Sequence, residues 1–292
     1  MSRSLIRTKK EAMKADKEDE APSSTSLLQE TSALFRLALP MTVLQFSVFF
    51  IFPETASAVG LQLGKEYLAG FSLGSLTGNL TLMTITVGVV SASDTLMPRA
   101  FVSGEYEEVG KLAIRAFVAT MLVMFVPCII LVSAMDPIYR TFHQNHFVGQ
   151  IAAQWLRIFV LGAPFASLVR VCQRFLGSQG VVWPIGISAS VGAFFIHPLM
   201  LWLLVPTLGF MGSALAIVIT QFMQISMALV YLYFRPVHHP RTWTGLSWET
   251  FMDAVRIGPM WAYLKLSIGG VLSFTEWCFW VSREAVAISK SV

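Results

Sequence analysis

Residues 209–234 read GFMGSALAIVITQFMQISMALVYLYF and contain no charged side chain. A helix needs about 20 mostly apolar residues to cross the hydrocarbon core of a bilayer, so this stretch alone is long enough to span a membrane. Windows of similar length give six further candidate spans, at 37–60, 68–93, 113–135, 151–171, 182–205 and 257–281. The sequence therefore predicts an all-α integral membrane protein.

The composition of the 292-residue chain favours the same class. Of its residues 55% are hydrophobic and only 13% are charged, whereas about a quarter of the residues in a soluble domain are charged. This hydrophobicity also excludes a chain that is disordered throughout. The three cysteines, Cys128, Cys172 and Cys278, lie far apart inside apolar stretches. Their spacing indicates neither a disulfide framework nor a zinc site.

The basic residues are distributed unevenly across the predicted membrane. If the N-terminus is cytoplasmic, fifteen of the 21 Lys and Arg residues lie on that side and three on the other. The positive-inside rule therefore favours a cytoplasmic N-terminus. A seven-helix receptor would need an external N-terminus and is disfavoured. The net charge of +4 is explained by this orientation signal, so nucleic acid is not expected as a partner.

The breaks between the spans divide the chain into four segments. Residues 1–33 are rich in Lys, Glu, Asp and Ser and predict a disordered cytoplasmic tail. Residues 34–235 predict a six-helix lobe, and 236–256 a cytoplasmic linker. Residues 257–292 predict a partial seventh helix, because Val281 to Val292 is not expected to continue the helix beyond Trp280.

Two carboxylates inside the spans are candidate functional residues, since a charge at membrane depth costs about 2.5–3.5 kcal/mol on insertion scales. Glu54 follows Pro53, and proline kinks a helix and frees a backbone carbonyl. Glu54 is either a cation or proton site or a carboxylate near the outer mouth that reaches water. Glu276 has apolar and aromatic neighbours that would desolvate it. Such surroundings suit a reversible proton carrier.

Two further polar residues are candidates. His197 precedes Pro198 in an apolar stretch; it is either a structural group with satisfied hydrogen bonds or a titrating group in a transport pathway. Asn79 lies on one polar face of the second span, where it could line a cavity or bond to another helix. The other polar face is predicted to be a helix-packing surface, because small residues let backbones approach closely. Its members are Thr77, Thr81, Thr84, Gly88 and Ser91.

No nucleophile–base pair, Gly-rich phosphate loop or metal-ligand spacing occurs in the sequence, so neither an enzyme nor a resident cofactor or metal is expected. Seven short segments point elsewhere. In chain order they are RLALPMTVLQFSV (36–48), LGKEYLAG (63–70), SASDTL (91–96), QRFLGSQG (173–180), MGSALA (211–216), TWTGLSW (242–248) and FTEWCFW (274–280). Together they resemble eukaryotic transporters of the multidrug and toxic compound extrusion (MATE) family, in that family's order and at matching spacing.

The resemblance implies a secondary antiporter that expels small organic cations against inward movement of a proton, or of sodium. It implies no cofactor, and a location in the plasma membrane or an organelle membrane. It also assigns residues. Glu276 stands at the family's helix-seven glutamate, which is implicated in cation binding and proton coupling, and Asn79 at the cavity asparagine of helix two. Gln45 matches the glutamine of helix one.

Two other residues carry a weaker likeness. His197 with Trp202 resembles a His and a Trp of plant and fungal members. Glu54 has no exact equivalent, although bacterial members place an aspartate close to it.

The length departs from the family pattern. Members of the family have two six-helix halves that hold substrate between them, whereas this chain contains one half and the start of the next. We therefore expect a C-terminally truncated chain that needs the missing C-terminal lobe or another chain for transport. Two alternatives stay open. One is a truncated membrane protein that does not transport, acting as an assembly partner or surviving as a relic. The other is a lipid or oligosaccharide flippase of related fold.

Overall fold

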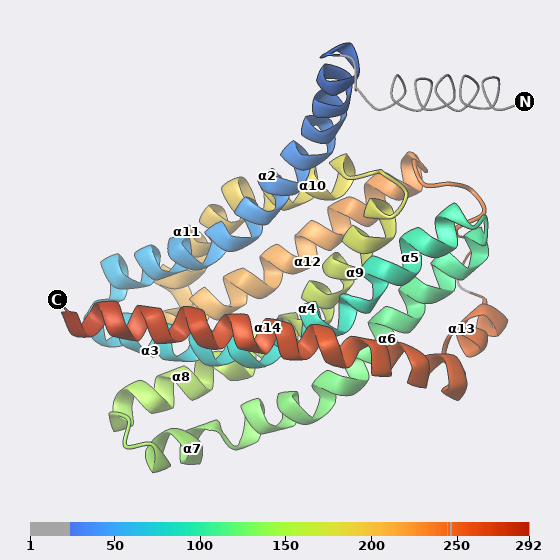
Figure 1. Cartoon of the computed structure of the whole chain (residues 1–292). Coiled ribbons are helices and arrows are strands. Elements are labelled where there is room, and N and C mark those ends of the chain that lie inside the picture. The colour runs from blue at the N-terminus through green and yellow to red at the C-terminus, as the bar shows by residue number, and fades with distance from the viewer. Residues whose placement is uncertain (1–23, 244, 246, 292) are drawn as a thin grey trace, which may run out of the picture. The chain divides into compact units, whose positions relative to one another are not determined.

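The computed structural model describes residues 24–243, 245 and 247–291, in which every regular element is a helix (Figure 1). The predicted disordered tail lies mostly outside these residues. The elements are α2 (Ser24–Leu63), α3 (Lys65–Gly78), η1 (Asn79–Met83), α4 (Thr84–Val90), α5 (Ala92–Val102), α6 (Tyr106–Ser133), α7 (Met135–Thr141), α8 (His146–Phe159), η2 (Val160–Gly162), α9 (Ala163–Gly177), α10 (Trp183–Val191), η3 (Gly192–Ile196), α11 (His197–Leu208), α12 (Phe210–Phe234), α13 (Trp248–Ala254) and α14 (Ile257–Ser291). The all-α prediction is confirmed.

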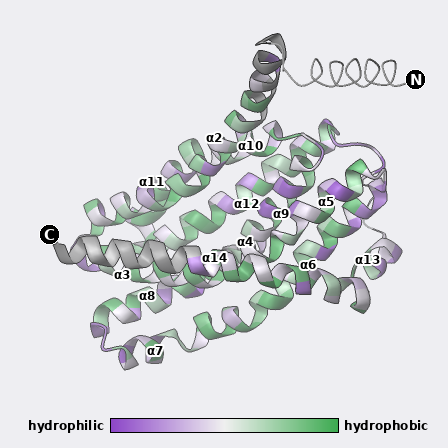
Figure 2. Cartoon of the chain, viewed as in Figure 1, coloured by the Kyte–Doolittle hydropathy of each residue, from purple (hydrophilic) through white to green (hydrophobic). Residues whose placement is uncertain are grey.

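Six helical stretches of the described chain are long and apolar enough to cross a membrane, and green hydrophobic positions run along them in Figure 2. They are Ala38–Leu63, Lys65–Val102, Tyr106–Ser133, His146–Gly177, Trp183–Leu208 and Phe210–Phe234. Each contains most or all of one of the first six predicted spans, so the six-helix prediction is confirmed. The seventh predicted span, 257–281, lies within α14.

Helix ends differ from the sequence-based expectation at three places. Helix α2 begins at Ser24, so residues 24–33 are helical and not a disordered tail. The linker 236–256 contains the short helix α13. Helix α14 continues to Ser291, so the expectation that the helix would fail after Trp280 is wrong for 281–291. The physical reason is that these residues include neither Gly nor Pro, the two residues that interrupt a helix most strongly.

Glycines end the helices where the chain must turn sharply. Gly64, between α2 and α3, has φ of 95°, and Gly104, between α5 and α6, has φ of 80°. A side chain is strained in this left-handed region, and glycine is not. Backbone geometry therefore favours glycine at both of these turns.

The chain divides into two compact units, Met1–Thr42 and Val43–Val292. Among the described residues, three hydrophobic cores lie within the second, the smallest around Leu201, Val205 and Ala216. One joins α4, α5, α6 and α9 to α14 and includes Met97 and Tyr263. Another surrounds Trp155 of α8, whose ring packs edge-on against Phe71, with centroids 5.4 Å apart. The Trp155 indole N–H donates to the Ser213 hydroxyl of α12 at 3.1 Å, which gives its polar end a partner inside the core.

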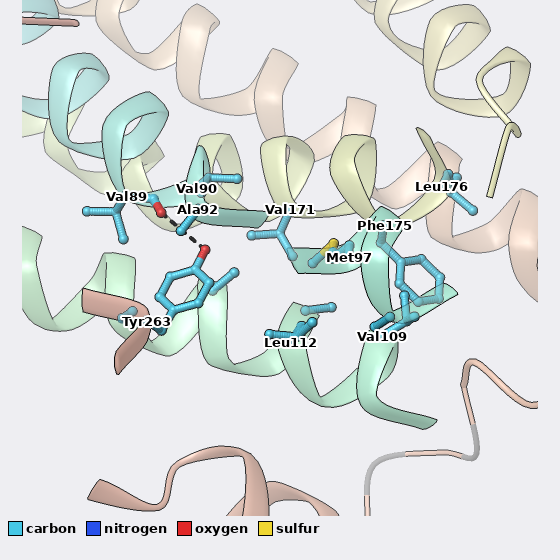
Figure 3. Packing of buried hydrophobic residues seen from close by; sticks show 14 of the residues in the cluster. Val89, Val90, Ala92, Met97, Val109, Leu112, Val171, Phe175, Leu176 and Tyr263 are labelled. Atoms are coloured by element: carbon cyan, nitrogen blue, oxygen red, sulfur yellow. Dashed lines mark hydrogen bonds between the residues drawn. The ribbon is translucent and has the colours of Figure 1, made fainter. Parts of the chain in front are cut away.

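Helix α14 is bonded to the end of α4 by buried hydroxyl groups. The Tyr263 hydroxyl donates to the Val89 carbonyl at 3.1 Å (Figure 3) and lies 2.8 Å from the Ser93 hydroxyl. Ser267, one turn further along α14, also reaches the Val89 carbonyl, at 3.1 Å. Tyr263 reaches Ser93, whereas Ser267, which comes later in α14, reaches the earlier residue Val89. The two helices therefore run antiparallel.

Small residues allow these helices to approach closely. A Cβ on Gly88 would meet the backbone of Val271, and one on Gly270 would meet Ser91 and the Gly88 carbonyl. The helix-packing role predicted for Gly88 and Ser91 is therefore confirmed. The adjacent Gly269 has open space where its Cβ would be, so the two neighbouring glycines of α14 differ in what they face.

This difference predicts the outcome of a matched pair of substitutions. Gly270→Val should push α14 off α4 and destabilise the protein by about 1–3 kcal/mol, as overpacking does. Gly269→Val should leave stability nearly unchanged. The midpoint of thermal unfolding in detergent, followed by size-exclusion chromatography, measures both. Equal midpoints for the two variants would contradict this account of the α4–α14 contact.

Candidate functional site

His197 is fully buried and joins three helices. Its Nε2 lies 2.8 Å from the Thr55 hydroxyl of α2, and its Nδ1 lies 3.1 Å from the Thr220 hydroxyl of α12. Its exposed fraction is 0%. Both ring nitrogens thus have partners, which matches the structural reading of this histidine. Trp202, paired with it by the resemblance, is 70% exposed and lies outside this cluster.

The hydrogen bonds around His197 also bear on its protonation. Thr55 donates to the Ile51 carbonyl at 2.8 Å, and Thr220 donates to the Ala216 carbonyl at 2.7 Å. The neutral ring has one donor and one acceptor nitrogen, so one threonine accepts from the ring and the other turns its hydroxyl toward it. Which threonine does so depends on the tautomer of the ring.

Two predicted site residues stand at π-helical turns. Asn79 begins η1, and His197 directly follows η3. At each turn the bonding shifts by one residue: the Thr84 N–H reaches the Asn79 carbonyl, and the His197 N–H reaches the Gly192 carbonyl. Such turns occur often at functional sites. Hydropathy does not reveal such turns, so neither was predicted.

Gln45 and Glu54 lie on α2, in the same long helix as Thr55. Both side chains are half-buried. One carboxylate oxygen of Glu54 is buried and has no hydrogen-bond partner within the described chain. No hydrogen bond joins this oxygen to another predicted site residue in the described chain.

Glu276 and Asn79 lie at similar depth on adjacent stretches of helix. Val271 of α14 is opposite Gly88, and the helices are antiparallel. At about 1.5 Å of rise per residue, Glu276 lies about 7.5 Å beyond that contact and Asn79 about 13.5 Å, a difference of about 6 Å. Glu276 is exposed on α14. The side chains of Trp277, Phe279 and Trp280 lie outside the described part.

Three of the sequence segments quoted above meet at the other end of the helices, away from Asn79 and Glu276. Asp94, in SASDTL, pairs with Arg174, in QRFLGSQG, at 2.9 Å. Gln179 of the latter segment accepts the His239 backbone N–H at 2.8 Å and the Thr242 hydroxyl at 3.3 Å. These bonds tie the connection between α12 and α13 to the end of α9.

The sequence profile of the MatE family matches residues 40–203, more than half of the chain. The chain belongs to the MatE family. Multidrug and toxin extrusion protein 1 of Danio rerio is 30% identical over 253 residues, covering 85% of the MatE chain and 41% of that relative. The protein of the same name from Mus musculus is 32% identical over 255 residues, covering 86% and 43%. An uncharacterized transporter of Schizosaccharomyces pombe is 27% identical over 262 residues, covering 88% and 47%.

The fold of the MatE chain is also that of solved transporters. The crystal structure of the eukaryotic MATE transporter AtDTX14 matches with a TM-score of 0.77 and 21% identity, covering 87% of this chain and 56% of that one. An outward-facing MATE transporter of the MOP superfamily gives 0.65 with 17% identity, covering 82% and 52%. The chain spans about half the length of the relatives it matches. It is a multi-pass membrane protein of a transporter family.

The hydrogen-bonding partners of the predicted residues were not predicted from the sequence. Thr55 and Thr220 hold His197, and Tyr263 with Ser93 fixes α14; each is an ordinary Thr, Ser or Tyr in an apolar span, which gives no signal of its own. Among the described residues no group of three or more His, Cys, Asp or Glu is placed to hold a metal ion.

The His197 cluster predicts the effect of removing one partner. Thr55→Val should leave a buried ring nitrogen unpaired and cost about 1–3 kcal/mol of stability. Thr207→Val is the control, because Thr207 is exposed on α11 and its hydroxyl bonds only to carbonyls of its own helix. Thermal midpoints in detergent compare the two. A midpoint for Thr55→Val no lower than that for Thr207→Val would refute the bond to His197.

Proposed function

We propose that this chain forms the N-terminal lobe of a secondary antiporter that exports small organic cations in exchange for protons. Membership of a transporter family rests on the match to the MatE family. The substrate class is supported by the name of the relatives, multidrug and toxin extrusion protein. Proton coupling is favoured over sodium by the likeness to eukaryotic members.

The observation that carries the proposal is the position of Glu276. It is exposed on α14, the helix bonded to α4 through Val89, and it lies within about 6 Å of the depth of Asn79. A carboxylate in a membrane span must face water, a partner or a cation, because facing lipid is costly. A second lobe covering this surface would enclose Glu276 and Asn79 in one cavity.

In the proposed mechanism a proton and a cationic substrate compete for Glu276. The ionised carboxylate attracts the cation; protonation removes the charge and releases it. Asn79 and Gln45 shape the cavity with hydrogen-bonding groups. The half-buried Glu54 is a second carboxylate on which a proton can reside. His197 bonds α2, α11 and α12 together through Thr55 and Thr220.

The orientation belongs to the same proposal. The surplus of Lys and Arg on the side of the N-terminus supports a cytoplasmic N-terminus. Exchange in this direction then moves cations from the cytoplasm to the outside or to an organelle lumen.

Transport is tested in vesicles with a fluorescent organic cation and an imposed pH gradient. The first sample holds this chain alone, and the second holds it joined to the second half of the Danio rerio relative. We expect gradient-driven cation movement in the joined protein. Movement by the chain alone would mean that copies of it supply the second lobe. A correctly inserted joined protein that moves no cation would overturn the proposal and favour the non-transporting alternative; movement of a labelled lipid instead would favour the flippase.

The role of Glu276 has its own prediction. Glu276→Gln in the active sample should reduce gradient-driven cation movement to the level of vesicles without protein, because the side chain keeps its shape but can no longer exchange a proton. Glu249→Gln is the control: it makes the same change at an exposed carboxylate of α13 and should leave transport unchanged. Full transport by Glu276→Gln would remove this residue from the mechanism.

A further inference from the structure

A large apolar cavity lies apart from the transport residues. Its volume is about 1010 Å³, and its walls come from α6, α9 and α12 and from the segment that follows α12. This volume is at the upper end of the range for small-molecule sites, about 300–1,000 Å³. None of Gln45, Glu54, Asn79, His197 or Glu276 lines it.

The cavity has the length of one leaflet of a bilayer. Its wall on α6 runs from Ala113 to Phe125, which is about 18 Å at 1.5 Å per residue. The hydrocarbon core is about 30 Å thick, so one leaflet is about 15 Å. Other wall residues are Leu168, Val171 and Leu229. A site of this shape and polarity suits a single hydrocarbon chain lying along the helices.

One end of the cavity is polar. His238 lies in its wall, and the Nδ1 of this ring is buried without a hydrogen-bond partner in the part of the chain that the structure describes. Burial lowers the pKa of His238 from its ordinary value, which favours the neutral ring. A buried polar atom without a partner is costly, and a ligand that bonds to it would remove that cost.

Positive charge flanks this end. Arg235 and Arg241 are exposed on either side of His238, and neither has an ion pair among the described residues. Two nearby carboxylates are engaged: Asp253 pairs with Lys111 and Arg256, and Glu108 pairs with Arg115. Three others, Glu105, Glu107 and Glu249, are exposed; the first two flank Tyr106, whose ring stacks on that of His239.

We propose that this cavity binds one acyl chain of an anionic phospholipid, with the lipid phosphate or ester oxygens at His238 and the headgroup charge at Arg235 and Arg241. Basic pockets between membrane helices on the cytoplasmic side recognise anionic headgroups. The Gln179 bonds to His239 and Thr242 hold this end in place, and the wall residue Trp243 packs near Phe175, with ring centroids 6.2 Å apart. The site is independent of whether the chain transports cations.

The test counts lipids retained on the chain by native mass spectrometry after mild extraction from vesicles of phosphatidylcholine and phosphatidylglycerol in equal parts. We expect one phosphatidylglycerol per wild-type chain. Leu229→Trp should fill the cavity and abolish this retention. Leu199→Trp, on α11, is the matched control, since Leu199 is 49% exposed and Leu229 is 45% exposed. Equal retention by Leu229→Trp and wild type would overturn the proposal.

A separate set of substitutions tests recognition of the headgroup. Replacing Arg235 and Arg241 together by Gln should weaken phosphatidylglycerol retention roughly 30-fold, from the usual contribution of each basic residue near an anionic surface. His238→Ala should also lower it, whereas His146→Ala, at an exposed position of α8, should not. Oleate retained as well as phosphatidylglycerol would assign the cavity to a free fatty acid and overturn the phospholipid.

A second measurement needs only conservative changes. Phosphatidylglycerol with brominated acyl chains should quench Trp243 fluorescence, seen as a larger loss of emission for wild type than for Trp243→Phe. The same loss in both proteins would show that no acyl chain reaches the cavity.

Discussion

The constraint on which this structure depends is that each backbone polar group in the hydrocarbon must be bonded within the protein. Helices satisfy it, and side-chain hydroxyls in the spans conform to it by donating back to carbonyls of their own helix. Ser47, Thr55, Thr86, Thr120 and Thr220 all donate to the carbonyl four residues earlier. Thr55 and Thr220 also bond to the two ring nitrogens of His197. Hydroxyls that bond within their own helices therefore also face the buried ring.

Close packing of small residues sets the position of the seventh helix. Gly88 and Gly270 allow the backbones of α4 and α14 to approach, and Tyr263 and Ser267 then reach the Val89 carbonyl. These contacts fix the register of α14, and the register fixes the depth of Glu276. The carboxylate is therefore placed by residues two to four turns away that carry no charge.

The six spans could be predicted because the thickness of the bilayer sets the length of each spanning helix, and the same length of sequence must then be apolar. The start of α2 at Ser24 and the continuation of α14 to Ser291 were missed, because polar residues form helices as readily as apolar ones when Gly and Pro are absent. Asn79 and His197 were found as polar residues in apolar runs. Their π-helical turns and the threonines that hold His197 were not, since Thr55 and His197 are 142 residues apart and no local pattern joins them.

The exposed carboxylate of Glu276 is the group on which the proposed exchange depends. A carboxylate at membrane depth has three ways to avoid the cost of facing hydrocarbon: it can take up a proton, bind a cation or lie in a water-filled cavity. In an antiport cycle, each of these ways corresponds to one state. A proton and a cation each remove the cost of an ionised carboxylate facing hydrocarbon, so either one can take the place of the other. Such a site needs a covering surface that opens and closes. The neighbouring exposed face of α14, and not the packed face at Val89, is where that surface belongs.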